Sequence, residues 1–240
     1  MDRNVLIVGH SHVQCLATAA LKAGNDNVEV VSIRKFPGFR SASPESVATM
    51  VLEGAKQKCP DAICLCLQGN EHNMLGLLEH PIPFSIGGSR TGSIPDQQAG
   101  RWFIPHSVVQ DSFRERLHKV PKIAEALLSV FPSARPLFLM PPPPISDWEH
   151  LLEFPGVFED KLHLGPAPDA LRLQLYEMEC QVFKEFAAAL NAPVIEAAAE
   201  TLDDRGFLKK GLYANDPSHA NPQYGKIMLD LVLQGAMKPR

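Results

Sequence analysis

The N-terminal segment of the chain constrains the fold most, because it reads as a strand, a tight turn and a helix. The run Asn4–Gly9 is apolar and ends at a glycine, and apolar residues then recur at helical spacing from Val13 to Ala23. A buried strand that passes so quickly into a helix is typical of an α/β protein. We therefore expect this segment to open a sheet that is covered by helices.

The same alternation continues along the chain. Further predicted strands cover Val28–Ile33, Ala62–Leu67, Pro136–Met140 and Pro193–Ile195. Further predicted helices cover Pro44–Lys56, Asp111–Phe131, Asp169–Leu190 and a segment that opens near Pro222 after the cap residue Asn221. Such alternation favours a parallel sheet with helices on both faces. The sequence predicts an α/β fold, a three-layer α/β/α sandwich with a five-stranded, mainly parallel sheet.

Two stretches depart from this rhythm. Residues 76–106 are rich in Gly, Pro and Ser and contain the aromatic residues Phe84, Trp102 and Phe103, and residues 141–168 begin with a proline-rich turn. Long irregular segments in a compact domain are usually binding loops or lids. We expect one domain over residues 1–240, with loop or lid segments at about 76–106 and 141–168.

Composition excludes several classes of partner. The formal net charge is −4 and no stripe of Lys and Arg is present, so nothing indicates binding to nucleic acid. The apolar run Val5–Val8 is too short for a signal-peptide core or a membrane span. The five cysteines are an odd number, and Cys64 and Cys66 would share one face of a strand as small apolar residues. A reducing, cytoplasmic location without a membrane partner is expected.

Polar residues gather where the predicted strands end. Because the carboxyl ends of parallel strands meet at one edge of a sheet, residues that follow different strands can form a shared site. The segments concerned are Gly9-His10-Ser11-His12, Lys35-Phe36-Pro37-Gly38, Gly69-Asn70-Glu71-His72 and, just before the last helix, Asp216-Pro217-Ser218-His219.

These segments contain the groups that acyl transfer requires: a nucleophile, a base with a group that fixes its tautomer, and donors for an oxyanion. Ser11 would start the first helix, where backbone amides stabilise negative charge. His219 would take its proton, oriented by Asp216 three residues before it. The Asn70 side chain and the Gly38 amide would complete an oxyanion hole with the Ser11 amide.

This pattern resembles the SGNH (GDSL-like) serine hydrolases. Their blocks are a Ser after the first strand, a Gly after the second, Gly-x-Asn after the third and Asp-x-x-His near the C-terminus, and the order matches across essentially the whole chain. The resemblance implies a flavodoxin-like fold and an esterase that needs no cofactor. It implies catalytic residues Ser11, Asp216 and His219, with Gly38 and Asn70 as oxyanion donors. The substrate would be a small-molecule or glycan ester, for which an O-acetyl group is a family-level candidate.

The first block departs from the family, because Gly9-His10-Ser11 replaces the usual Gly-Asp-Ser. The histidines also allow a second hypothesis, a metal-dependent hydrolase. A ligand set of His10, His12, Glu71, His72, Asp216 and His219 is similar to part of the metallophosphoesterase pattern. The motif order differs, however, and the Asp-rich first blocks of those enzymes are missing.

Three further alternatives concern what the fold is used for. A non-catalytic binding module could line a groove with Trp102 and Phe103, since a fold by itself does not prove a function. An acyltransferase would use the same residues with an alcohol in place of water. A dinucleotide site is excluded, because the turn after Gly9 lacks the second and third glycines of that motif.

Overall fold

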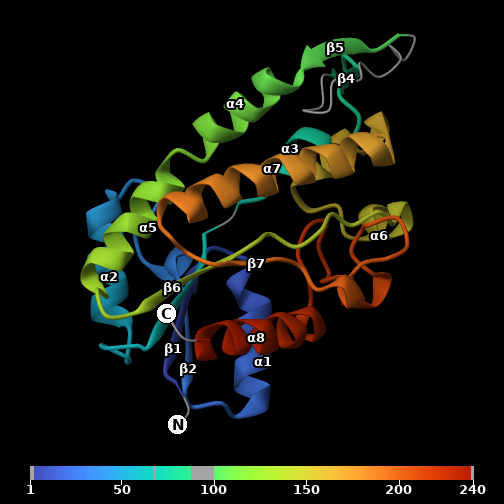
Figure 1. Ribbon diagram of the computed structural model, residues 1–240. Coiled ribbons are helices and arrows are strands. Elements are labelled where there is room, and N and C mark those ends of the chain that lie inside the picture. Colours follow the sequence, from blue (N-terminus) through green and yellow to red (C-terminus); the bar gives the residue numbers. More distant parts are fainter. Residues whose placement is uncertain (1–2, 68, 88–99, 239–240) are drawn as a thin grey trace.

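The computed structural model describes residues 3–67, 69–87 and 100–238. Its central sheet has five parallel strands in the order β2-β1-β3-β6-β7 (Figure 1). The strands are β1 (Val5–Gly9), β2 (Val28–Ser32), β3 (Ala62–Cys66), β6 (Arg135–Leu139) and β7 (Val194–Ile195). The predicted α/β fold with a five-stranded parallel sheet is therefore confirmed.

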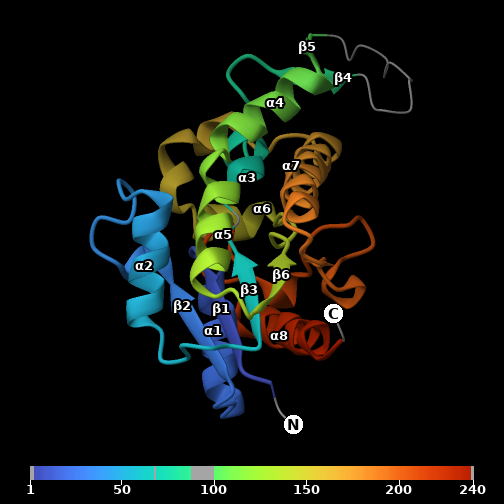
Figure 2. The ribbon, with the colours of Figure 1, turned by 60° about the vertical axis from the view of Figure 1, so that its left-hand side comes forward.

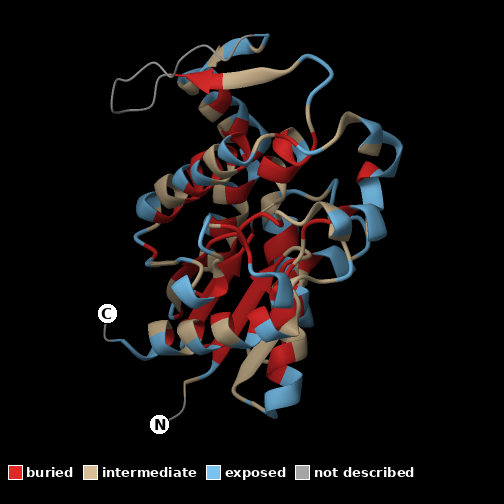
Figure 3. Ribbon diagram, turned by 90° about the vertical axis from the view of Figure 1, so that its right-hand side faces the viewer, coloured by how far each residue is buried: buried red, intermediate tan, exposed pale blue. Residues whose placement is uncertain are grey.

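Helices cover both faces of this sheet (Figure 2). Along β1, Val5 and Ile7 pack on one side against helices α1 (Val13–Ala23) and α8 (Pro222–Met237). Leu6 and Val8 pack on the other side with α2 (Pro44–Gly54), α5 (Lys119–Val130) and α7 (Asp169–Ala189). These four β1 residues are fully buried, and buried strand segments fill the centre of the molecule (Figure 3). None of the helices in the described ranges has the length and apolar character needed to cross a membrane.

Two glycines allow close backbone contacts near the carboxyl edge of the sheet. A Cβ atom on Gly9, the last residue of β1, would lie 2.0 Å from the carbonyl oxygen of Cys66 at the end of β3. A Cβ atom on Gly225 of α8 would lie 2.2 Å from the carbonyl oxygen of Cys15 on α1. Real atoms cannot approach so closely, so each position requires glycine.

The helix predicted over Asp111–Phe131 is two helices, α4 (His106–Arg116) and α5 (Lys119–Val130). The break has a local cause. Pro121 lacks a backbone N–H and would disrupt the interior of one continuous helix, but it is tolerated in the first turn of a new one. The single long helix was therefore a wrong prediction.

The two segments predicted as irregular contain short elements. Within 76–106, β4 (Phe84–Gly87) and β5 (Trp102–Pro105) form a separate parallel pair, and residues 88–99 lie outside the described residues. Within 141–168 lie helix α6 (Trp148–Glu153) and a 3₁₀ helix at Gly156–Leu164. Asp147 caps α6 by accepting a hydrogen bond from the His150 amide at 3.2 Å.

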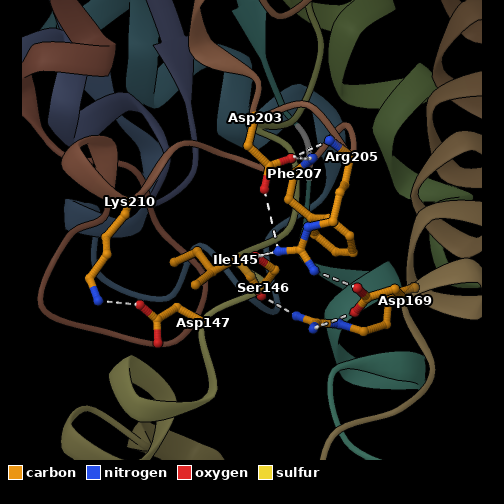
Figure 4. A network of polar contacts seen from close by, with 9 residues as sticks. Ile145, Ser146, Asp147, Asp169, Asp203, Arg205, Phe207 and Lys210 are labelled. Carbon is orange, nitrogen blue, oxygen red and sulfur yellow. Dashed lines mark hydrogen bonds and ion pairs between the residues drawn. The ribbon is translucent and has the colours of Figure 1, made fainter.

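The segment before α6 is held to the rest of the fold by charged groups (Figure 4). Arg205 donates to Asp169 at the start of α7 and to the Ser146 hydroxyl, both at 2.7 Å. Lys210 and Asp147 form an ion pair at 2.6 Å. The segment is thereby tied both to α7 and to the loop that precedes the Asp216 turn.

Candidate active site

The structure forms the predicted hydrogen bond between Asp216 and His219. Asp216 Oδ1 accepts from His219 Nδ1 at 2.9 Å and from the amides of Ser218 and His219 at 2.9 and 2.7 Å. Burial raises the pKa of Asp216, but the hydrogen bonds from the His219 ring and these amides outweigh it and hold the pKa at about 2. With its Nδ1–H donating to the carboxylate, the imidazole presents an Nε2 lone pair that can accept a proton.

Several elements hold this turn in place. Helix α8 begins directly after it, where Asn221 Oδ1 accepts from the Gln223 amide at 2.9 Å. His150 of α6 donates its Nε2–H to the Asp216 carbonyl at 3.0 Å. Part of the segment 141–168 therefore supports the Asp216 turn, a role that the sequence did not indicate.

Ser11 lies in the turn between β1 and α1. The helix begins at Val13 with His12 at its N-cap, and the Ser11 carbonyl accepts from the Gln14 amide at 3.1 Å. Ser11 is half-buried and lines two cavities. One, of about 610 Å³, is also lined by Asp216 and His219, and the other, of about 480 Å³, is also lined by Asn70. Three of the other four predicted site residues thus line a cavity together with Ser11.

The Nε2 atom of His219 is covered from solvent and has no hydrogen-bond partner among the described residues. Ser11 and His219 share a cavity, yet no Ser11–His219 hydrogen bond is formed within these residues. Catalytic hydrogen bonds are often loose in ligand-free enzymes and tighten when substrate binds. The arrangement leaves His219 Nε2 without a partner among the described residues, in a side chain that lines the same cavity as Ser11.

Asn70 occupies the N-cap of helix α3 (Glu71–Gly76), but its side chain makes no cap hydrogen bond. Instead its Oδ1 atom accepts from Nδ2 of Asn73, which is buried one turn further along the helix. This contact fixes the amide so that the Asn70 Nδ2 group can donate elsewhere. Asn73 was missed from the sequence, although its spacing of three residues on a helix was a usable signal.

Gly38 is placed less favourably for the predicted role. It lies in an exposed turn with a φ of 72°, and it is not among the described residues that line either Ser11 cavity. Its neighbours Phe39 and Arg40 do line the 480 Å³ cavity. Of the proposed oxyanion donors, the structure brings Asn70 to Ser11 and leaves Gly38 at the margin.

His12 packs directly behind His219, with the two ring centroids 4.6 Å apart. It is only 5% exposed, and neither of its ring nitrogens has a hydrogen-bond partner among the described residues. Burial, together with repulsion from His219 and His72, lowers the pKa of His12 to about 3 against the opposing influence of the Gly69 carbonyl and Asp216. His12 is therefore an uncharged ring at neutral pH.

A buried acid lies deeper in the same cluster. Glu179 of α7 has no exposed surface, and its Oε2 atom accepts from the His72 amide at 2.9 Å and contacts His72 Nδ1 at hydrogen-bond distance. The acceptor fixes the tautomer and orientation of the His72 ring. Glu179 was not identified from the sequence, where it is one of several acidic residues on a predicted helix.

The structure bears on two other hypotheses, the metal-dependent hydrolase and the non-catalytic binding module. Among the described residues, no group of three or more His, Cys, Asp and Glu side chains is arranged to hold a metal ion, so the six residues considered for a metal site do not form one. Trp102 and Phe103 lie on β5 and line two different cavities, and neither cavity includes Ser11. A ligand groove around these aromatics would be separate from the serine site.

Comparison with known proteins places this geometry in context. No protein-family model matches the chain, and no curated protein matches it. A solved structure from Streptococcus pneumonia, described as a candidate platelet activating factor, is similar at 12% identity and a TM-score of 0.53, covering 97% of this chain and 85% of that chain. This likeness shows a shared α/β fold, which in this chain is a five-stranded parallel sheet flanked by helices.

Two further similar structures lie at lower TM-scores. One is a GDSL-like lipase from Bacteroides thetaiotaomicron, with 11% identity, a TM-score of 0.49 and coverage of 98% of this chain and 88% of that chain. The other is a psychrotrophic esterase from Pseudoalteromonas sp., with 10% identity, a TM-score of 0.46 and coverage of 97% and 96%. The fold comparison therefore rests on the first structure.

Proposed function

We propose that the chain is an SGNH-type serine hydrolase that cleaves a carboxylic ester. The observation that carries the proposal is the hydrogen-bonded Asp216–His219 pair, because His219 lines a cavity together with Ser11 and its Nε2 atom has no hydrogen-bond partner among the described residues. The carboxylate orients the ring and stabilises the imidazolium that forms during catalysis. Asn70, held by Asn73 beside Ser11, supplies a side-chain donor for the oxyanion.

The proposed reaction has two steps. Ser11 Oγ attacks the ester carbonyl while its proton passes to His219 Nε2, and the alcohol leaves with that proton as the acyl-enzyme forms. Water then attacks the acyl carbon and His219 takes the water proton; His219 returns that proton to Ser11 Oγ as the bond between Oγ and the acyl carbon breaks, which releases the carboxylic acid and regenerates the serine. The negative charge on the carbonyl oxygen rests on the Ser11 amide and the Asn70 side chain, with Gly38 as a third donor if its turn moves inward on binding.

The proposal also covers the domain organisation, location, partners and substrate class of the protein. We propose one domain over residues 1–240, a cytoplasmic location, no nucleic-acid partner, and a small-molecule or glycan ester as substrate. An O-acetyl ester is the first candidate because it needs only a small acyl site. An acyltransferase would replace water by an alcohol at the second step.

The test is initial-rate hydrolysis of p-nitrophenyl acetate by the wild-type chain and by Ser11→Ala, each with and without a chelator. We expect a release of p-nitrophenol that resists chelation and falls by roughly 10³-fold or more in Ser11→Ala, because the nucleophile is removed. Ser218→Ala provides a matched control, since Ser218 lies in the Asp216 turn but would carry no catalytic step.

Each outcome has a distinct meaning. Trapping of an acetyl group on Ser11, detected by mass spectrometry of the quenched reaction, would establish the acyl-enzyme. Activity that survives in Ser11→Ala and is lost with the chelator would refute the triad and favour metal chemistry. Transfer of the acetyl group to an added alcohol at the expense of acetate would identify an acyltransferase.

A further inference from the structure

The 480 Å³ cavity beside Ser11 and Asn70 is unusually rich in positive charge. Its lining includes four cationic side chains, and Glu71 is the acid among the described lining residues. Glu71 Oε2 is already engaged by Arg116 Nη1 at 2.8 Å. The remaining cations are Arg34, Arg40 and Lys119.

These three cations have no acidic partner in the part of the chain that the structure describes. Within the described residues, none of the ion pairs involves Arg34, Arg40 or Lys119. The whole chain has a formal net charge of −4. The cavity is therefore a local region of positive charge in a protein that is negatively charged as a whole. Like charges that converge on a concave surface raise the local concentration of anions.

The cations come from three separate segments. Arg34 lies in the 3₁₀ turn Ile33–Lys35 that follows β2, Arg40 lies in the loop that leads to α2, and Lys119 is the first residue of α5. A cation at a helix N-terminus is disfavoured by the helix dipole, and the first turn of α5 has no acidic residue to offset it. An anion bound in the cavity that the three residues line would relieve this repulsion.

The histidine next to Ser11 leaves the positive charge in place. His10 lines the cavity, and burial together with the nearby Arg34 lowers its pKa to about 4. An uncharged imidazole offers no compensating charge to the guanidinium. The charge of Arg34 therefore remains available to a ligand.

The floor of the cavity is apolar. Its apolar lining residues include Leu67, Leu117, Val120 and Ile123. The volume of the whole cavity lies within the range of small-molecule sites. A suitable ligand therefore combines an apolar body with an anionic group. Arg side chains in particular match the geometry of carboxylate and phosphate oxygens.

We propose that the ester substrate carries a carboxylate or phosphate group, which Arg34, Arg40 and Lys119 bind while its apolar part fills the floor of the cavity beside Ser11. This inference rests on the proposed esterase function, because it assigns the cavity to the substrate of Ser11. It narrows the substrate from esters in general to anionic esters.

The first experiment compares matched esters. Phenyl acetate, 4-acetoxybenzoate and 4-acetoxyphenyl phosphate vary the charge on the alcohol side, and p-nitrophenyl hexanoate and p-nitrophenyl hydrogen adipate vary it on the acyl side. We expect kcat/KM for at least one anionic ester to exceed that of its neutral partner by about tenfold or more, since hydrogen bonds to charged groups are the stronger ones. The preferred ester distinguishes carboxylate from phosphate.

The second experiment asks whether the cations cause the preference. In the double variant Arg34→Gln, Arg40→Gln, and separately in Lys119→Gln, the ratio of anionic to neutral kcat/KM should fall by about tenfold. Lys226→Gln, an exposed lysine on α8 away from the cavity, should leave that ratio unchanged. Equal kcat/KM for neutral and anionic esters, or a ratio that the cavity variants do not alter, would overturn the inference while leaving the esterase proposal intact.

A binding measurement separates the two proposals. Benzoate, phenyl phosphate and phenol are titrated into Ser11→Ala, and NMR follows the resonances of the cavity. If no ester is hydrolysed but the two anions bind and the double arginine variant abolishes that binding, the anion site stands and the esterase proposal fails. If the anions bind no better than phenol, the anion site is refuted.

Discussion

His10 and His12 lie on either side of Ser11, but their surroundings differ. His12 is buried against the His219 ring and its pKa is lowered further by His72, while both of its ring nitrogens are unpaired among the described residues. His10 lines the 480 Å³ cavity, and the centroid of its ring lies 5.9 Å from that of Phe39. Its pKa is lowered mainly by burial and further by Arg34. Two residues of one type, separated by the serine alone, belong to two different environments.

The difference assigns separate tasks to the two sides of Ser11. On the buried side, packed rings and an acid fix the orientation of the groups behind His219, where a small displacement would disturb proton transfer. On the open side, exposed cations border a cavity and can select a ligand. We expect changes on the buried side to affect stability and turnover, and changes on the open side to affect substrate preference.

The strongest test of the buried side is Glu179→Ala. Removing the acid leaves the His72 amide and ring without their acceptor inside the protein, and each buried donor left unpaired costs about 1–3 kcal/mol. Urea unfolding should show a lower midpoint at an unchanged slope. Glu177→Ala, two residues away on the exposed side of α7, is the control and should change stability by less than about 0.5 kcal/mol. A Glu179→Ala variant as stable as this control would show that the pair is not structural.

Asn70 and its hydrogen-bond partner Asn73 should affect turnover to different extents. Asn70→Ala should lower kcat by about 10²–10³-fold, as expected for loss of an oxyanion donor. Asn73→Ala removes only the hydrogen bond that orients Asn70, so its effect on kcat should be roughly fivefold to tenfold, the value of a single hydrogen bond. Steady-state kinetics with circular dichroism as a folding control tests both. Equal losses in the two variants would contradict the assigned division of roles.

The low pKa of His12 predicts that the folded protein loses stability in mild acid. Its pKa is about 3 in the folded state and about 6.5 when unfolded, so as the pH falls below 6.5 the unfolded chain takes up the proton first. The stability that His12 contributes is complete above that pH and should decline by about 2 kcal/mol by pH 5. Comparing the pH slope of unfolding free energy in wild type and His12→Asn tests this. An unchanged slope in the variant would mean that His12 takes up its proton in the folded state.

The smallest expected effect is a difference between His10 and His12 in how their pKa values respond to salt. Because Arg34 contributes to the low pKa of His10 and is exposed, added salt should weaken that contribution and raise the pKa by a few tenths of a pH unit. The His12 pKa, set mainly by burial, should not move. NMR titration of the two Cε1 protons in low and high salt measures the difference directly. Parallel shifts would show that both rings face solvent.

Features that depend on local pattern were predictable from the sequence. The strands emerged as short apolar runs because both faces of a parallel sheet are buried, and the start of α8 followed from Asn221 and Pro222. The Asp216–His219 contact is likewise local, since both residues lie in one turn. Pro121 also carried a readable signal, which marks the start of α5.

Features that depend on distant segments were not predictable. His72 and Glu179 are 107 positions apart, and nothing in the spacing of acidic residues on α7 distinguishes the buried one. Arg34, Arg40 and Lys119 come from segments whose convergence follows from the order of the strands and the packing of α5. The parallel pair β4–β5 was hidden for the same reason, because its partner strand follows a long intervening segment.

The contact between Gly225 and Cys15 has a consequence for how this protein can vary. Ser11 precedes α1 and His219 precedes α8, and these helices meet backbone to backbone at a place that excludes any side chain at position 225. A larger residue there would push apart the two helices that follow Ser11 and His219. The Gly225 contact therefore sets how closely α1 and α8 approach each other, and with it the spacing between the two turns that precede these helices.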